Sequence, residues 1–130
     1  MRGGLATLKT RADFLRVAAA RHSAAAPGVV VQAAVRPKLW DEVPAIRVGF
    51  TASRKVGNAV TRNRAKRRLR AVASTVLPSK GRPGTDYVLI ARSGTAGRAY
   101  AALLADLEAA LRRVDGRGGE KRRAMAEEKG

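Results

Sequence analysis

The chain has 130 residues, which is enough for one domain with a buried core. It carries 27 Lys and Arg against 10 Asp and Glu, a formal net charge of +17, and it has no Cys. The missing Cys excludes disulfides, thiolate zinc sites and Cys nucleophiles. No apolar run approaches the roughly 20 residues that cross a bilayer, and no signal peptide is visible. We therefore expect a soluble, cytoplasmic protein that does not span a membrane.

The first third of the chain predicts one helix and one strand. Thr10 can cap a helix with Asp13 three residues later, and apolar residues at helical spacing extend it to about residue 20. The run 24–28 contains Pro and Gly and ends this helix. The β-branched residues within 28–36 then predict a strand.

The middle of the chain predicts a second strand and a long helix. A polar turn is expected at 37–44. Apolar and polar residues alternate over 45–53, which predicts a strand with one buried face and one reachable face. Asn58 is a good N-cap for a helix that runs to about Leu77.

The last third predicts a strand and a final helix. Pro and Gly within 78–84 mark a loop, and the short apolar run 87–91 is typical of a strand. Ser93 or Thr95 can cap the final helix. The residues thus predict an α+β fold, a single-domain sandwich of helices on a small sheet. The element order is α-β-β-α-β-α, with room for one extra short strand. We assign residues 1–7 to a flexible N-terminus, 8–115 to the domain and 116–130 to a charged disordered tail.

The positive charge is concentrated in the middle of the chain. Between Val43 and Thr85 there are eleven Lys and Arg and no Asp or Glu. Ordinary soluble domains mix the two signs on their surface, so this block indicates a nucleic acid or an anionic membrane as partner. Phosphate contacts would come from these cations, from Arg54 and Lys55 just ahead of the basic helix, and from backbone N–H groups at its start.

The most basic stretch is Arg62–Arg70, with six cations in nine residues. On a helix, its cations flank a narrow apolar stripe that can pack on a core. That stripe consists of Ala65, Leu69, Val72 and Val76. Like charges at i, i+4 destabilise a helix by a few tenths of a kcal/mol per pair, and no acidic residue in the stretch offsets this. A polyanion would supply the missing charge.

Candidates for catalytic side chains are few. The only His is His22, expected near the end of the first helix as a surface or capping residue. Four acidic residues are scattered and read as caps, turn residues or solvated charges: Asp13, Asp41, Glu42 and Asp86. They do not form the carboxylate cluster that a metal-dependent nuclease requires. We therefore assign no catalytic and no metal-binding residue to the chain.

One long motif resembles a known family. The run from Phe50 to Arg70, with its core Arg62-Asn63-Arg64 followed by Lys66-Arg67, closely resembles the signature of the bacterial ribonuclease P protein component. The resemblance extends from about Leu8 to about Val114. It implies a mixed sheet with a left-handed β-α-β crossover through the basic helix.

The resemblance also implies a function. In this family, a large RNA carries out the cleavage that removes the 5′ leader from precursor tRNA. The protein binds that RNA and the leader. We thus expect an endoribonuclease ribonucleoprotein subunit whose partners are ribonuclease P RNA and precursor tRNA. No obligate protein partner is predicted, and magnesium ions would be held mainly by the RNA.

Residue roles follow from the motif and its neighbours. We expect eight residues to bind the ribonuclease P RNA: Arg54, Lys55, Asn58, Arg62, Asn63, Arg64, Arg67 and Arg68. The resemblance places five in or beside a cleft between the sheet and the first helix, where the leader runs: Phe14, Arg47, Ser53, Lys66 and Arg70. Two places that are often aromatic in the family are Ala18 and Gln32 here, so charge and hydrogen bonding are expected to outweigh base stacking.

Three alternatives stand beside this interpretation. A structural RNA-binding protein of the ribosomal type has the same composition, and only the long motif argues against it. A basic helix on anionic lipid needs a broad face of bulky apolar residues, whereas this stripe is narrow and is needed for the core, so we expect no membrane partner. A self-sufficient nuclease requires the carboxylate set that the sequence lacks.

Overall fold

A computed structural model describes residues 5–36 and 46–129, with side chains through residue 115. The turn expected at 37–44, with Asp41 and Glu42, lies outside the described residues. The elements follow one another in the order β1 (Leu5–Thr7), α1 (Arg11–Ala19), β2 (His22–Ala26), β3 (Val29–Val35), β4 (Ile46–Thr51), η3 (Arg54–Val56), α2 (Ala59–Lys80), β5 (Thr85–Ala91), η4 (Thr95–Gly97) and α3 (Tyr100–Lys129).

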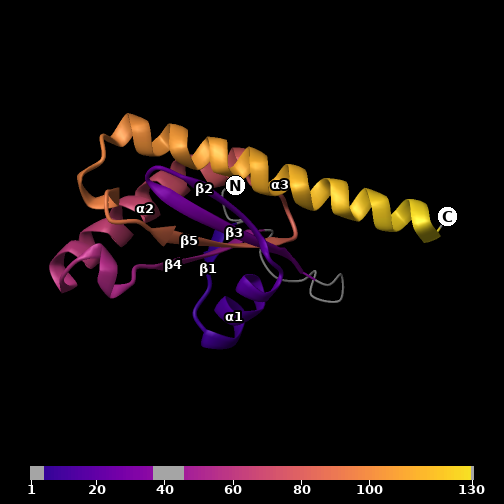
Figure 1. Ribbon diagram of the computed structural model, residues 1–130, viewed down its shortest axis with the longest axis horizontal. Helices are drawn as coiled ribbons and strands as arrows, with labels where there is room; N and C mark the ends of the chain where they lie inside the picture. The colour runs from indigo at the N-terminus through magenta and orange to yellow at the C-terminus, as the bar shows by residue number, and fades with distance from the viewer. Residues whose placement is uncertain (1–4, 37–45, 130) are drawn as a thin grey trace.

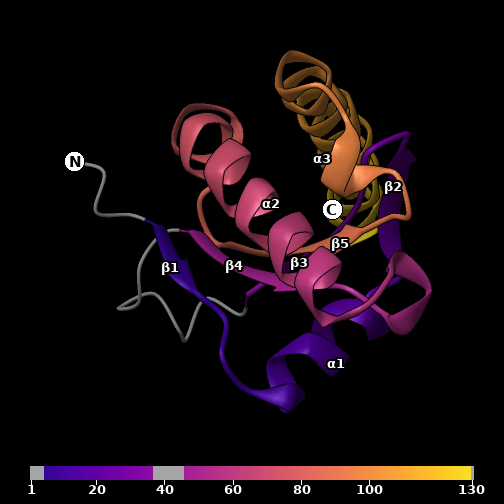
Figure 2. The same ribbon diagram turned by 90° about the vertical axis from the view of Figure 1, so that its left-hand side faces the viewer.

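The five strands form one mixed sheet in the order β1-β4-β5-β3-β2. β4 is parallel to both β1 and β5, while β3 is antiparallel to β5 and to β2. Helices α2 and α3 cover one face of the sheet and α1 lies on the other (Figures 1 and 2). The α+β sandwich predicted from the sequence is therefore confirmed.

The long helix α2 connects two parallel neighbours, β4 and β5. The arrow of β5 points to the left in Figure 1, and Figure 2, seen from that side, shows α2 above the sheet and β5 to the right of β4. Viewed from the side of α2 with both strands pointing upward, β5 therefore lies to the left of β4. The crossover is therefore left-handed, as the resemblance implies. Such connections are right-handed in about 98% of cases, so general rules of topology would have placed β5 on the wrong side.

The main core lies between the sheet and the pair α2 and α3. The apolar stripe of α2 is buried there, with Ala65, Leu69 and Val72 at 0% exposure. Ile46 and Val48 of β4 point into the same core, which confirms the alternation predicted for this strand. A smaller cluster joins α1 to the opposite face and consists of Leu8, Val17, Ala34 and Val88.

Two short strands correct the expected order. Residues 5–7 pair with β4 as strand β1, where the sequence analysis expects a flexible N-terminus through residue 7. His22 begins strand β2, not the end of a helix. β2 is rich in Ala, which has a low strand propensity, so its pairing with β3 across the Pro27-Gly28 turn decides its conformation.

The helix ends show three further differences. α2 continues past Leu77 to Lys80 with Pro78 inside it, whereas Pro78 was expected in a loop. Neither Ser93 nor Thr95 caps the last helix: η4 intervenes, and the hydroxyl of Thr95 accepts from the N–H of Arg92 and donates to the carbonyl of Gly28, each at 2.7 Å. α3 runs to Lys129 in place of the disordered tail expected from residue 116. The last ten residues are mostly good helix formers, which outweigh the glycines before them.

Candidate nucleic-acid interface

Two local features set the start of the basic helix α2. Asn58 is the N-cap, and its side-chain oxygen accepts a hydrogen bond from the N–H of Thr61 at 2.9 Å. The short η3 turn ahead of it anchors Val56 in the core and leaves Arg54 and Lys55 exposed. The predicted cap is thus confirmed, and the cations of η3 lie at the positive end of the helix dipole.

The N-terminal half of α2 presents unpaired positive charge. Asn63, Arg64 and Arg67 are exposed and Arg62 is half-buried. Within the described part of the chain, no hydrogen bond or ion pair is formed by the side chains of Arg54, Lys55, Arg62, Arg64 or Arg67. Cations held together without acidic partners favour an external polyanion.

Arg68 has a structural contact that the sequence did not predict. One of its terminal nitrogens donates to the backbone carbonyls of Thr95 and Ala96, at 2.8 and 2.9 Å. This contact ties α2 to η4. Arg68 therefore stabilises the fold, and the RNA contact expected for this half-buried residue stays a prediction.

The five residues expected in the leader cleft are divided between the two faces of the sheet. Phe14 of α1 lies directly on Gly49 of β4, where an added Cβ would be only 2.4 Å from the ring. Arg47 lies on the same face and contacts α1 through Asp13, at 3.6 Å. Phe14 is half-buried. Part of its side chain packs on β4 and part remains exposed to solvent.

Lys66 and Arg70 come from α2, which lies on the opposite face (Figure 2). The guanidinium of Arg70 lies 5.2 Å from the centre of the Phe50 ring, at cation–π distance. Beside it is a hollow of about 220 Å³ between α2, β4 and β1. Ser53 is exposed after the end of β4. The sheet edge at β1 and β4 thus separates Phe14 and Arg47 from Arg70.

The sequence analysis missed a buried ion cluster on the α1 face. The carboxylate of Asp86, with a side-chain exposure of 0%, accepts hydrogen bonds from Arg16, Arg36 and Arg47. Arg47 forms a fork, Nε to Oδ1 at 2.9 Å and Nη2 to Oδ2 at 2.7 Å, and Arg36 donates to Oδ1 at 2.6 Å. Asp86 was expected to be a turn residue or a solvated charge, and that was wrong.

This cluster changes the ionisation of its members. Burial alone would raise the pKa of Asp86, but the hydrogen bonds from Arg47, Arg36 and Arg16 outweigh burial and hold that pKa below its usual value. The same contact with Asp86 raises the pKa of Arg47. No sequence signal links these residues, because the three arginines come from separate elements. An acidic residue at the start of an otherwise apolar strand was the only clue.

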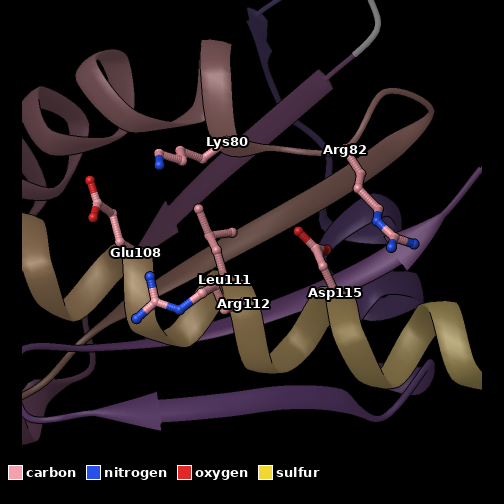
Figure 3. A pocket seen from close by; sticks show the side chains of 6 residues that line it. All are labelled: Lys80, Arg82, Glu108, Leu111, Arg112 and Asp115. Carbon is pink, nitrogen blue, oxygen red and sulfur yellow. The ribbon is translucent and has the colours of Figure 1, made fainter.

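A larger hollow lies at the other end of α2, against α3. It has a volume of about 440 Å³ and is lined by Lys80, Arg82, Glu108, Leu111, Arg112 and Asp115 (Figure 3). Figure 3 shows Glu108 projecting toward the side of Lys80, the guanidinium of Arg112 below it, and the guanidinium of Arg82 pointing away from all three. Its mixture of acidic and basic side chains does not continue the basic surface near the start of α2.

The described residues contain no group of three or more His, Cys, Asp or Glu side chains that could hold a metal ion. None of the helices in the described part of the chain has the length and apolar character of a membrane span.

Asp13 is part of the α1 cap, as expected: its N–H donates to the Thr10 hydroxyl at 3.2 Å.

Comparison with known proteins decides the family. The family model "Ribonuclease P" matches residues 4–115. The chain belongs to the ribonuclease P protein family. The resemblance carried by the motif from Phe50 to Arg70 is thus confirmed, and the chain serves as the protein subunit of ribonuclease P in tRNA processing.

Curated relatives agree with the family model. The ribonuclease P protein component of Paramagnetospirillum magneticum is 53% identical over 114 residues, covering 88% of this chain and 86% of that protein. The component from Ruegeria pomeroyi is 55% identical over 112 residues, covering 85% of this chain and 87% of that protein.

Solved ribonuclease P proteins share the fold. The protein from Staphylococcus aureus superposes with a TM-score of 0.65 at 32% identity, over 82% of this chain and 92% of that one. The protein from Thermotoga maritima gives a TM-score of 0.62 at 26% identity, over 78% of this chain and 90% of that one.

Proposed function

We propose that this chain binds the catalytic RNA of ribonuclease P and the 5′ leader of precursor tRNA, and that the RNA carries out the cleavage. The observation that carries the proposal is the cluster of unpaired cations on η3 and the first turns of α2. Acidic residues are absent from this region, so the phosphates of a folded RNA are the natural counter-charge.

We assign the RNA contact to the exposed residues of that surface. These are Arg54, Lys55, Asn63, Arg64 and Arg67, with the half-buried Arg62 at the edge. Asn58 is the N-cap of α2, and the backbone N–H groups at this end of the helix favour binding of a phosphate. Arg68 holds α2 in place by its hydrogen bonds to the backbone of η4.

We assign the leader to the sheet edge near β4. Phe14 offers a half-buried ring on the α1 face, and Lys66 and Arg70 offer charge on the α2 face of the same edge. A single-stranded RNA leader that follows this edge would contact both the Phe14 ring and the cations on the α2 face. The aromatic residues available for stacking are few, so phosphate contacts would dominate over reading of base identity.

We propose that the magnesium ions of the reaction are held by RNA phosphates. A surface made of Lys and Arg repels a divalent cation unless phosphates intervene. The protein would act by positioning the leader and by offsetting repulsion between the two RNAs. The cytoplasm, where precursor tRNA is processed in bacteria, is the compartment that fits this role.

The test is cleavage of a 5′-labelled precursor tRNA at low magnesium, with protein alone, RNA alone, and both together. We expect efficient cleavage at the mature 5′ end only in the mixture. Cleavage by the protein alone would place the chemistry in the protein. No effect of the protein on the RNA would favour the alternative of a structural RNA-binding protein.

A further inference from the structure

The α1 helix has a weak apolar attachment to the rest of the molecule. It spans only Arg11–Ala19, and isolated helices of that length are unstable in water. Among the residues that the structure describes, the apolar cluster beneath α1 has four buried members, against twenty-two in the main core. Other contacts must therefore contribute to the orientation of α1 on the sheet.

Those contacts are ionic and converge on Asp86. Arg16 of α1 donates to Oδ2 of Asp86 in the centre of the sheet. Arg47 of β4 binds the same carboxylate and also lies 3.6 Å from Asp13 of α1. α1 is thus held at two of its residues, one through an arginine of its own and one through an arginine of the sheet.

Phe14 is next to Asp13 in this helix, and its ring lies on the backbone of Gly49. A Cβ at residue 49 would be 2.4 and 2.6 Å from two ring carbons. The place of the ring therefore depends closely on the position of α1. A small tilt of the helix would lift the ring from Gly49 and change the surface beside β4.

We propose that Asp86 is a positioning residue: together with Arg16 and Arg47 it fixes α1 on the sheet and so holds Phe14 where the leader of precursor tRNA passes. This inference rests on the proposed leader contact. Asp86 itself has no exposed side-chain surface with which to reach the leader. It acts through the helix, and binding of the ribonuclease P RNA by α2, on the opposite face, does not depend on it.

The test measures leader preference and ring position in the same variants. Asp86→Asn and Arg16→Gln are assembled with the ribonuclease P RNA, and affinity is measured for precursor tRNA with a long leader and with a single-nucleotide leader. We expect both variants to lose about tenfold in affinity for the long leader only, the size of one lost base–aromatic stack. In the free protein, the nuclear Overhauser contact between the Phe14 ring and Gly49 should weaken in both.

Asp106→Asn is the matched control. Asp106 is another buried carboxylate, 6% exposed, that pairs with an arginine, Arg98, but it belongs to α3 on the other face. It should keep both the leader preference and the Phe14–Gly49 contact. A change common to all three variants would indicate general loss of stability and would contradict the positioning role.

The remaining outcomes also decide the question. If Asp86→Asn does not fold, Arg16→Gln gives the answer, since Arg16 is partly exposed. Folded variants that keep the full leader preference overturn the proposal. A wild-type complex with no leader preference would refute the leader contact itself, while protein-stimulated cleavage at low magnesium would still support the subunit role.

Discussion

At the scale of single residues, the arginines of this chain fall into two groups. Arg64 and Arg67 are exposed on α2 and meet no acidic side chain among the described residues, whereas Arg68 is bound to two backbone carbonyls. The three are close in sequence and equal in chemistry. Their different roles follow from the direction in which each leaves the helix.

Arg64→Ala should weaken binding of the ribonuclease P RNA without loss of fold. One lost phosphate contact lowers the slope of log affinity against log salt by about one unit. A salt titration of RNA binding measures this. Arg68→Ala is the comparison: it should lower the melting temperature, because it removes the two hydrogen bonds that join α2 to η4. An unchanged slope in Arg64→Ala would contradict the RNA contact.

The ionisation of Asp86 predicts an acid-sensitive stability. Its pKa is lower in the folded protein, so its contribution is present above the unfolded value of about 3.9 and is lost as pH falls through the folded value. Asp86→Asn should cost about 3 kcal/mol at neutral pH, since it removes the buried negative charge to which Arg16, Arg36 and Arg47 donate. Thermal melts between neutral and acid pH measure both effects. The difference between wild type and variant should shrink below about pH 4; a constant difference would contradict it.

At the scale of elements, α2 combines two roles along its length. Its apolar stripe fills the core, its N-terminal half presents the cations, and its C-terminal end passes through Pro78 to Lys80. The N–H of Gly81 still donates to the carbonyl of Leu77 at 2.9 Å, so the helical hydrogen-bond pattern continues past the proline.

Pro78→Ala should raise stability by about 1 kcal/mol. An alanine at this position would have an N–H that donates to the backbone carbonyl of Ser74, and the steric clash of the proline ring with that carbonyl would be removed. The unfolded chain would gain conformational freedom, which offsets part of the stabilisation. Chemical denaturation of the variant measures the change. Ser79→Ala, at a position that already has its N–H, is the control and should have a smaller effect. A less stable Pro78→Ala would mean that α2 ends at Leu77, as the sequence suggests.

At the scale of the whole molecule, the described core ends before the last segment of α3. The buried side chains that the structure describes end at Val114, and the match to the family ends at residue 115. The helix α3 continues beyond the sheet (Figure 1). The described core and the family match thus both end before residue 116.

Removal of residues 116–130 should leave the melting temperature unchanged. It also deletes five Lys and Arg and three Glu, a small part of the net charge of +17. We therefore expect RNA affinity to stay within about twofold, as for loss of a weak surface charge. Thermal melts and RNA titrations of the truncated chain check this. A lower melting temperature would show that the segment packs on the domain.

The sequence alone determined the α+β class, the long basic helix with its cap at Asn58, and the family, because these depend on local spacing and on one long motif. Only the tertiary structure decided which cations remain free. Strand β2 forms because β3 lies beside it, Arg68 turns to η4, and Asp86 accepts hydrogen bonds from an arginine of α1, one of β4 and the one that follows β3. The contacts of Arg68 and Asp86 join residues far apart in the chain, because buried charges and backbone groups must find partners wherever the fold places them.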